Sequence, residues 1–337
     1  ELINAIKNNV SNVTSYEKEI LNLTNLMDTV NKSSWAATPE LTAEQVKFGA
    51  IGRQFDLLSG KKTDNLESET TTESKLLTNE VLQKFLKYYV KDTSKDLEDG
   101  LKNIVVGNTE YAGLCANMEQ IVSYETEFVN MAKLVDVAKD TSKPLVQIGK
   151  TIDGIKENSV LVPSILSDIV VYYVNENVPD DYASAKTLIK NKLKPTDGSQ
   201  KVEILSYERE FGYMAQLKEL AEQNPIKIVR KTSDDPDAII AGELFNQITS
   251  NPQTASVILT RDVIAEVIKI VIDKQLATYN DMGDELKAIV KTIGNNAANI
   301  VDYEMEFKHM DTLLTEMNNQ TVDVDRLGGK LDAAEAD

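Results

Sequence analysis

The feature that most constrains this chain is a short motif that recurs four times along its length. The copies read SYEKEI from Ser15, SYETEF from Ser123, SYEREF from Ser206 and DYEMEF from Asp302. Averaged over the three intervals, the tyrosines lie about 96 residues apart, a spacing typical of a tandem repeat. A repeat of this size predicts stacked helical or helical-bundle units rather than one large core.

Two further motifs recur in register with the first. One keeps a glycine and, four residues later, an aspartate or asparagine, in IGRQFD, IGKTID, AGELFN and LGGKLD. The other reads SKLLTNEVLQKFLKYYV, NSVLVPSILSDIVVYYV and ASVILTRDVIAEVIKIVI. The positions that define the repeat are Tyr16, Glu17, Glu19, Gly52, Asp56, Tyr124, Glu125, Glu127, Gly149, Asp153, Tyr207, Glu208, Glu210, Gly242, Asn246, Tyr303, Glu304, Glu306, Gly328 and Asp332.

These motifs predict the boundaries of the units. Residues 1–19 end a preceding repeat, 20–127, 128–210 and 211–306 form three repeats, and 307–337 begin a further one. The chain is therefore expected to be a fragment of a longer array. The first and third repeats are about ten residues longer, because they contain the proline-bearing insertions WAATPELTAEQ and NPIKIVRKTSDDP, which we expect to be surface loops.

Each unit contains several segments whose apolar residues recur with helical periodicity. In IVSYETEFVNMAKLVDVA the apolar residues step by three or four, which predicts an amphipathic helix. The glycine motif predicts a second helix, and the SKLL-type segment a third that is apolar on more than one side. A fourth segment, ELKAIVKTIGNNAANI, leads back towards the next tyrosine motif, and whether it continues into that helix stays open. The predicted fold class is all-α, either an α-solenoid or a string of small helical bundles.

Charge argues against polyanionic partners. The chain has 36 basic and 54 acidic residues and a net charge of −18, which repels phosphate backbones and anionic lipid head groups. We therefore expect no direct binding of nucleic acid. The most apolar run, ASVILTRDVIAEVIKIVI, contains four charged side chains, so no membrane span is predicted.

The two glutamates of the tyrosine motif are not placed to act together in catalysis. Its two carboxylates are two residues apart, which places them about 200° apart around a helix and prevents them from acting as a pair. We interpret the motif as structural, with the tyrosine packed between helices and a glutamate capping a helix or pairing with a basic neighbour. The glycines lack the phosphate-loop pattern, and close approach of two helices explains them better.

A metal site would need more ligands than the sequence supplies. Glu306 and His309 form one E-x-x-H step, but helical metal sites need a second step facing it, and His309 is the only histidine. We therefore predict no catalytic residue, no cofactor and no metal.

Two places in the insertions are candidate partner contacts. The first insertion contains Trp35, which we expect to be tucked over helix ends or, as the alternative, to anchor a partner. The second contains a basic cluster of Lys227, Arg230 and Lys231.

The tandem combination of a Y-E-x-E-[FI] helix, an [IL]-G-x-x-[IFL]-D helix and an S-x-[LV]-L helix resembles the helical repeats of very large virion proteins of tailed bacteriophages. The third unit departs from this pattern at Asn246. The resemblance implies a non-enzymatic structural segment, either internal or ejected cargo or tape-measure-like, located in the virion. Its implied partners are other subunits of a large assembly, copies of itself included. A bacterial cell-surface or secreted stalk and an α-solenoid scaffold that binds proteins stay open as alternatives.

Overall fold

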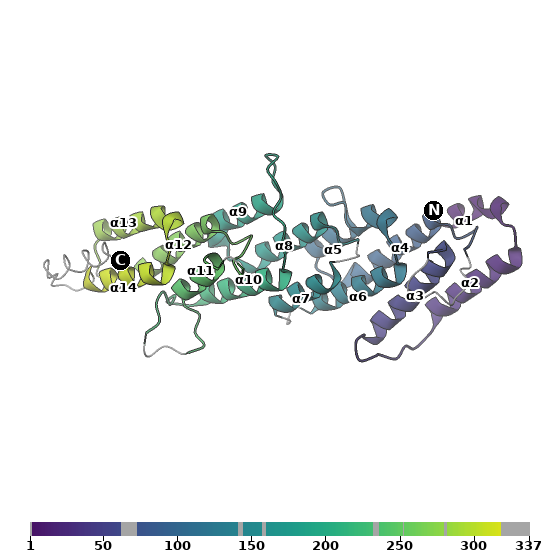
Figure 1. Cartoon of the computed structure of the whole chain (residues 1–337), viewed down its shortest axis with the longest axis horizontal. Helices are drawn as coiled ribbons and strands as arrows, with labels where there is room; N and C mark the ends of the chain where they lie inside the picture. Colours follow the sequence, from purple (N-terminus) through teal and green to yellow (C-terminus); the bar gives the residue numbers. More distant parts are fainter. Residues whose placement is uncertain are drawn as a thin grey trace. The chain divides into compact units, whose positions relative to one another are not determined.

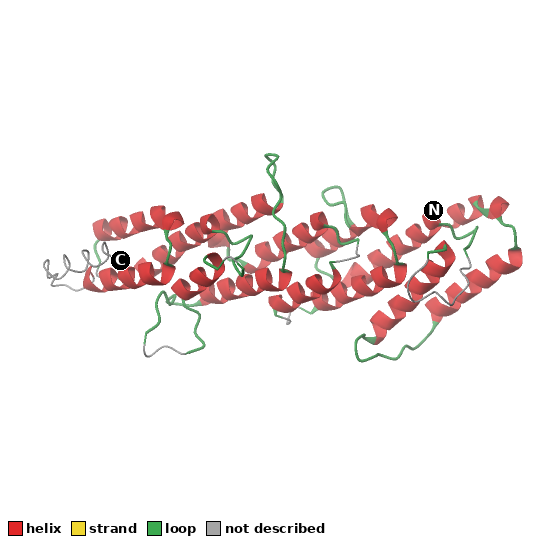
Figure 2. Ribbon diagram, in the orientation of Figure 1, coloured by secondary structure: helices red, strands yellow, loops and turns green. Residues whose placement is uncertain are grey.

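A computed structural model describes residues 2–61, 73–140, 144–156, 160–231, 236–251, 253–279 and 282–317. Within these ranges the regular secondary structure is helical and no strand is present (Figure 2). The predicted all-α fold class is therefore confirmed. Gly328 and Asp332 of the fourth glycine motif lie outside the described residues.

The helices follow the three predicted motifs. Those that begin with the tyrosine motif, here called the tyrosine helices, are α2 (Tyr16–Asn31), α6 (Tyr124–Lys139), α10 (Tyr207–Glu222) and α14 (Tyr303–Met317). Those that contain the glycine motif, the glycine helices, are α3 (Ala43–Ser59), α7 (Leu145–Ile155) and α11 (Ala241–Thr249). The third motif forms α4 (Asn79–Thr93), α8 (Pro163–Asn177) and α12 (Arg261–Leu276).

The remaining helices connect these sets. They are α1 (Leu2–Asn8), α5 (Asp99–Val106), α9 (Ala183–Leu193) and α13 (Asp284–Ile293), with the short 3-10 helices η1 (Val10–Asn12), η3 (Ser94–Asp96), η4 (Leu114–Gln120), η5 (Asp180–Tyr182) and η6 (Gly294–Asn299) (Figure 1). None of the described helices is long and apolar enough to cross a membrane.

The chain forms two compact units. The first contains residues 1–143 and 150–169, and the second contains residues 144–149 and 170–337. Residues 144–149 belong to the second unit, where Gly149 packs against the start of α10. A compact unit can hold parts of more than one repeat, so the repeat boundaries derived from the sequence stay predictions.

Every tyrosine helix starts at a side-chain cap. Ser15, Ser123 and Ser206 adopt extended backbone conformations, and their hydroxyls accept hydrogen bonds from the amides of Lys18, Thr126 and Arg209. Asp302 caps α14 in the same way by accepting from the Met305 amide at 3.1 Å. An N-cap residue needs this extended conformation. Because Ile300 is also extended after η6, the fourth segment of the unit ends before α14 and is not continuous with it.

Aromatic side chains hold the glycine helices to the tyrosine helices. In the first unit Phe55 of α3 meets Tyr124 and Phe128 of α6, with ring centroids 5.6 and 5.3 Å apart. In the second unit Phe245 of α11 lies 5.9 Å from both Tyr303 and Phe307 of α14. These edge-on and tilted contacts between buried rings add to the free energy gained from burying their area.

The second insertion is partly buried, which the sequence analysis did not predict. Ile226 and Ile228 are each 3% exposed, so the expectation of a surface loop is wrong for them. The carbonyls of Lys227 and Ile228 accept hydrogen bonds from the amides of Ala241 and Gly242, the first residues of α11. The loop thus supplies the acceptors that the first amides of α11 require.

Candidate functional site: the junction between glycine and tyrosine helices

Glycine lets two helix backbones meet at each junction between a glycine helix and a tyrosine helix. A Cβ atom placed on Gly52 would lie 2.6 Å from the Cα of Glu125, and one on Gly242 would lie 2.7 Å from the Cα of Glu304. At Gly149 the same atom would lie 2.6 Å from the carbonyl carbon of Tyr207. Such distances to backbone atoms are too short for any larger residue, so the close approach expected from the sequence is present at these three glycines.

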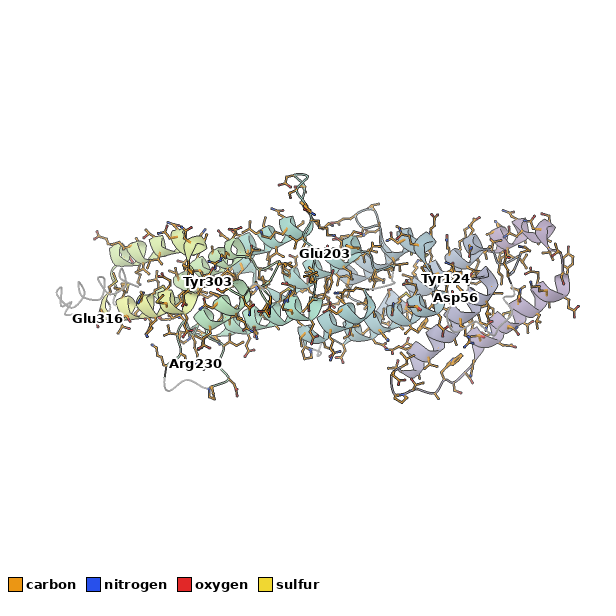
Figure 3. The ribbon with its side chains drawn as sticks, in the orientation of Figure 1. Asp56, Tyr124, Glu203, Arg230, Tyr303 and Glu316 are labelled. Carbon is orange, nitrogen blue, oxygen red and sulfur yellow. The ribbon has the colours of Figure 1, made fainter. Side chains whose placement is uncertain are left out.

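One turn after Gly52, an aspartate caps the partner helix. Asp56 is fully buried, and Figure 3 shows it beside Tyr124. Its Oδ1 accepts a hydrogen bond from the Tyr124 amide at 2.7 Å, and its Oδ2 accepts from the Glu125 amide and the Ser123 hydroxyl, each at 2.9 Å. The first amides of a helix have no partner within the helix, so Asp56 satisfies donors that burial would otherwise leave unpaired. In the sequence, Asp56 is identifiable only as one of the positions that define the repeat.

The electrostatics of this junction follow from its burial. Desolvation raises the pKa of Asp56, while its backbone donors, Ser123 and the charge of Lys61 oppose that rise. Lys61 donates to the Ile121 carbonyl and lies 5.4 Å from the centroid of the Tyr124 ring. Burial also raises the pKa of Tyr124 to about 12, so this phenol stays neutral at physiological pH.

The α11–α14 junction uses a different pair of polar residues from the α3–α6 junction. Asn246 replaces the aspartate, and the cap of the tyrosine helix is Asp302 instead of serine. Asn246 still accepts from the Tyr303 amide through Oδ1 at 2.8 Å, and its Nδ2 donates to Asp302 Oδ1 at 2.8 Å. This bond to Asn246 is the largest factor that lowers the pKa of Asp302. The junction keeps one donor and one acceptor, and two facing carboxylates are avoided.

On α2, α6 and α10 the second glutamate of the motif binds the segment that precedes a third-motif helix. Glu19 accepts from the Ser74 hydroxyl and from the Lys75 amide at 2.6 Å. Glu210 accepts from the Ser256 hydroxyl and from the Val257 amide at 3.0 Å, and burial raises its pKa. Glu127 accepts from the Val160 amide at 2.9 Å. These carboxylates lie at 0 to 6% exposure, and they bind backbone amides.

The other residues of the motif are more exposed. Glu17, Glu208 and Glu304 are exposed, and Glu125 is half-buried; all sit in a first helical turn, where negative charge favours the helix dipole. Asp153 is half-buried, and one of its oxygens lies 3.0 Å from Lys156 Nζ.

Two residues depart from the predicted packing. Tyr124, Tyr207 and Tyr303 are buried as expected, but Tyr16 is 64% exposed. The physical reason is that Gly52, Gly149 and Gly242 face the starts of α6, α10 and α14, and no described glycine motif faces the start of α2, although α3 contacts α2. Glu306 is likewise exposed, while its counterparts on α2, α6 and α10 are buried.

The candidate partner contacts in the insertions make contacts within the chain. Trp35 is half-buried, and the ammonium of Lys32 lies 4.1 Å from its ring centroid. Arg230 binds both oxygens of Glu243 at 2.8 Å, and Lys231 lies 3.3 Å from Asp311. The Lys227 amide donates to Gln223 Oε1 at 3.0 Å. Their role as partner contacts stays a prediction.

The described residues also form a small cavity next to one of these glutamates. One apolar cavity of about 20 Å³ lies between α4, η4 and α6, next to Glu127, and has room for about one water molecule. No group of three or more His, Cys, Asp or Glu side chains is arranged to hold a metal ion within the described ranges.

Comparison with protein-family models, with curated proteins and with solved structures gave no match to this chain.

Proposed function

We propose that this chain is a non-enzymatic structural segment of tandem helical repeats in which buried polar contacts fix the tyrosine helices to neighbouring segments. The observation that carries the proposal is that polar side chains of the glycine and tyrosine motifs bind backbone amides of neighbouring segments. Asp56 and Asn246 cap tyrosine helices, while Glu19, Glu127 and Glu210 bind the segments that precede α4, α8 and α12. Polar groups engaged in this way serve to fix helices to one another.

The energetics agree with a structural role. A buried carboxylate is costly unless hydrogen bonds satisfy it, and removing its partner leaves a penalty of about 1–3 kcal/mol per group. Asp56 alone receives three donors at 2.7 to 2.9 Å. Repeating such sites along a chain gives each contact between neighbouring helices a fixed register, which suits a component whose purpose is its length and rigidity.

We further propose that the segment belongs to a large virion protein of a tailed bacteriophage, as internal or ejected cargo or as a tape-measure-like component. The resemblance of the three motifs supports this placement. The net charge of −18 also suits a protein that shares a particle with packaged nucleic acid without adhering to it.

Peptide mapping and intact-protein mass spectrometry of purified native particles test this proposal. We expect peptides from this sequence at the abundance of a structural protein, within a chain of continuing repeats. A native precursor that carries a secretion signal and a cell-wall anchor would overturn the virion assignment in favour of a surface stalk.

A further inference from the structure

A glycine and a valine face each other at a second position of the α3–α6 junction. Gly49 lies three residues before Gly52, and a Cβ atom placed on it would lie 3.0 Å from Cγ2 of Val129 on α6. Val129 comes five residues after Tyr124, the residue that Gly52 meets. An ordinary contact between carbon atoms is about 3.5–4.0 Å long, so 3.0 Å is tight. The valine of the tyrosine helix therefore fills this point of the junction and leaves little room for a side chain on the glycine helix.

The α7–α10 junction has the same two residue types in exchanged positions. Val146 lies three residues before Gly149 on α7. Gly212 lies five residues after Tyr207 on α10. A Cβ atom placed on Gly212 would lie 3.9 Å from Cγ2 of Val146, so the two positions that meet at the α3–α6 junction also meet here. Each junction thus holds one valine and one glycine, and the junctions differ in which helix supplies the valine.

The order of helices along the chain gives α10 a nearby competitor for α7. Residues 140–144 alone separate the end of α6 from the start of α7, whereas α10 begins at Tyr207. Helices joined by a short connection usually pack against each other, because closing a short loop costs less chain entropy than closing a long one. Gly149 of α7 nevertheless packs on the start of α10. The packing of α7 on α10 therefore has to outweigh the advantage of the shorter connection.

We propose that the exchanged valine–glycine pairs select the partner of these two glycine helices, so that α3 joins α6 and α7 joins α10. If α7 packed on α6, Val146 would face Val129, and two valines would compete for the space of one. A valine in a helix is held to essentially one rotamer, so neither side chain turns away readily. If α3 packed on α10, Gly49 would face Gly212 and leave a hollow in place of a valine, which loses apolar contacts. Both wrong pairings are therefore less stable than the observed ones.

The α11–α14 junction lacks this exchange, so the selection applies to the first two junctions. The position three residues before Gly242 is Ile239, and α11 begins only at Ala241. What distinguishes this junction is the polar pair of Asn246 with Asp302. The selection by valine and glycine deepens the proposed structural function, on which it rests, because it names the tyrosine helix that each of two similar glycine helices accepts.

A double-mutant cycle in urea unfolding of the full chain tests the steric match at the α7–α10 junction. Gly212→Val should raise the unfolding equilibrium constant by about tenfold, because it sets a second valine against Val146. Adding Val146→Gly recreates the arrangement of Gly49 with Val129, so the double variant should be about tenfold more stable than the two single effects predict by addition. Gly212→Ala is the matched control: its methyl group fits at ordinary contact distance, and it should be at least as stable as the unmodified chain. Effects that simply add would overturn the match.

Refolding from urea, followed by circular dichroism, tests whether the pairs also choose the partner. In the double variant of Val146→Gly with Gly212→Val, α7 no longer carries the valine that keeps it off α6. We expect an additional slow refolding phase, because α7 docks first on the nearby α6 and has to leave it before it reaches α10. The mirror variant, Gly49→Val with Val129→Gly, makes room on α6 for Val146 and should show the same additional phase. Gly212→Ala should refold like the unmodified chain, since Val146 and Val129 are both kept.

Each outcome of the refolding experiment decides one part of the proposal. Double variants that refold with the phases of the unmodified chain would refute the selection of partners. Double variants that do not fold would refute the steric match itself, because the exchanged residues would then not fit one another. Neither result depends on whether the chain occurs in virions, which the particle mapping decides separately.

Discussion

Two glycines of α7 allow a direct test of the junction. Gly149 faces the start of α10, where an added Cβ would lie 2.6 Å from the Tyr207 carbonyl carbon and 2.8 Å from the Glu208 Cα. Gly154 lies in the same helix, and nothing is within 4 Å of its added Cβ. Gly149→Ala and Gly154→Ala are therefore the same chemical change in two different surroundings. The added methyl group meets backbone atoms at Gly149 and open space at Gly154.

The two substitutions should have opposite effects on the free energy of unfolding. Alanine stabilises a helix interior by about 1 kcal/mol relative to glycine, and Gly154→Ala should gain up to about this amount. Gly149→Ala gains the same helix propensity but forces two backbones apart. Overpacking a tight contact costs about 1–3 kcal/mol or more. Because the obstacle is backbone, which cannot rotate away, we expect the cost to exceed the gain and Gly149→Ala to be destabilising by up to about 2 kcal/mol net.

Urea unfolding followed by far-ultraviolet circular dichroism measures both variants against the unmodified chain. Hydrogen–deuterium exchange then localises the effect, which should appear as faster exchange in the first turns of α10 for Gly149→Ala alone. If Gly149→Ala were as stable as Gly154→Ala, the close approach of the two backbones would not be a requirement of the fold.

Three further outcomes follow from the polar contacts. Asn246→Asp should destabilise the second unit by about 1–2 kcal/mol because it sets two carboxylates together, and adding Asp302→Ser should recover the loss; thermal melts of both variants check this. Asp56→Ala should cost about 3 kcal/mol by leaving buried amides unpaired, a value accessible by urea unfolding. Burial raises the pKa of Glu210 above its ordinary 4.5, so its contribution to stability is fully present below that pH and is lost as the pH rises through the raised value. Glu210→Gln should therefore flatten the part of the stability curve that falls with rising pH, and melts across a pH series would contradict this if the two curves stayed parallel.

Local sequence rules were sufficient to predict the helices but not their polar partners. Serine or aspartate before Y-E-x-E predicts where a helix starts, and the structure begins α2, α6, α10 and α14 at those tyrosines. The role of Asp56 could not be read in the same way. Its partners Ser123, Tyr124 and Glu125 are more than sixty residues away along the chain, and only tertiary packing brings them together.

Some of the missed features had a signal in the sequence. The glycine motif in which Asn246 replaces aspartate is followed by a tyrosine motif in which Asp302 replaces serine, and this coupled change indicates that the two positions touch. Isoleucines at alternate positions in PIKIVR indicate a half-buried segment within the second insertion, where Ile226 and Ile228 are in fact buried. The exposure of Tyr16 had no local signal, since all four copies share the Y-E-x-E pattern around the tyrosine.

The pairing of Asn246 with Asp302 also bears on which glycine helix can pack against which tyrosine helix. Helices as alike as α3 and α11 are potential competitors for α6 and α14, and misassembly between similar units is a known hazard of repeat proteins. If α3 met α14, Asp56 would face Asp302 and two negative charges would be buried together, which disfavours that mispairing. The pairing of Asn246 with Asp302 therefore disfavours this one wrong pairing of helices, which the shared glycine and tyrosine motifs alone would not distinguish.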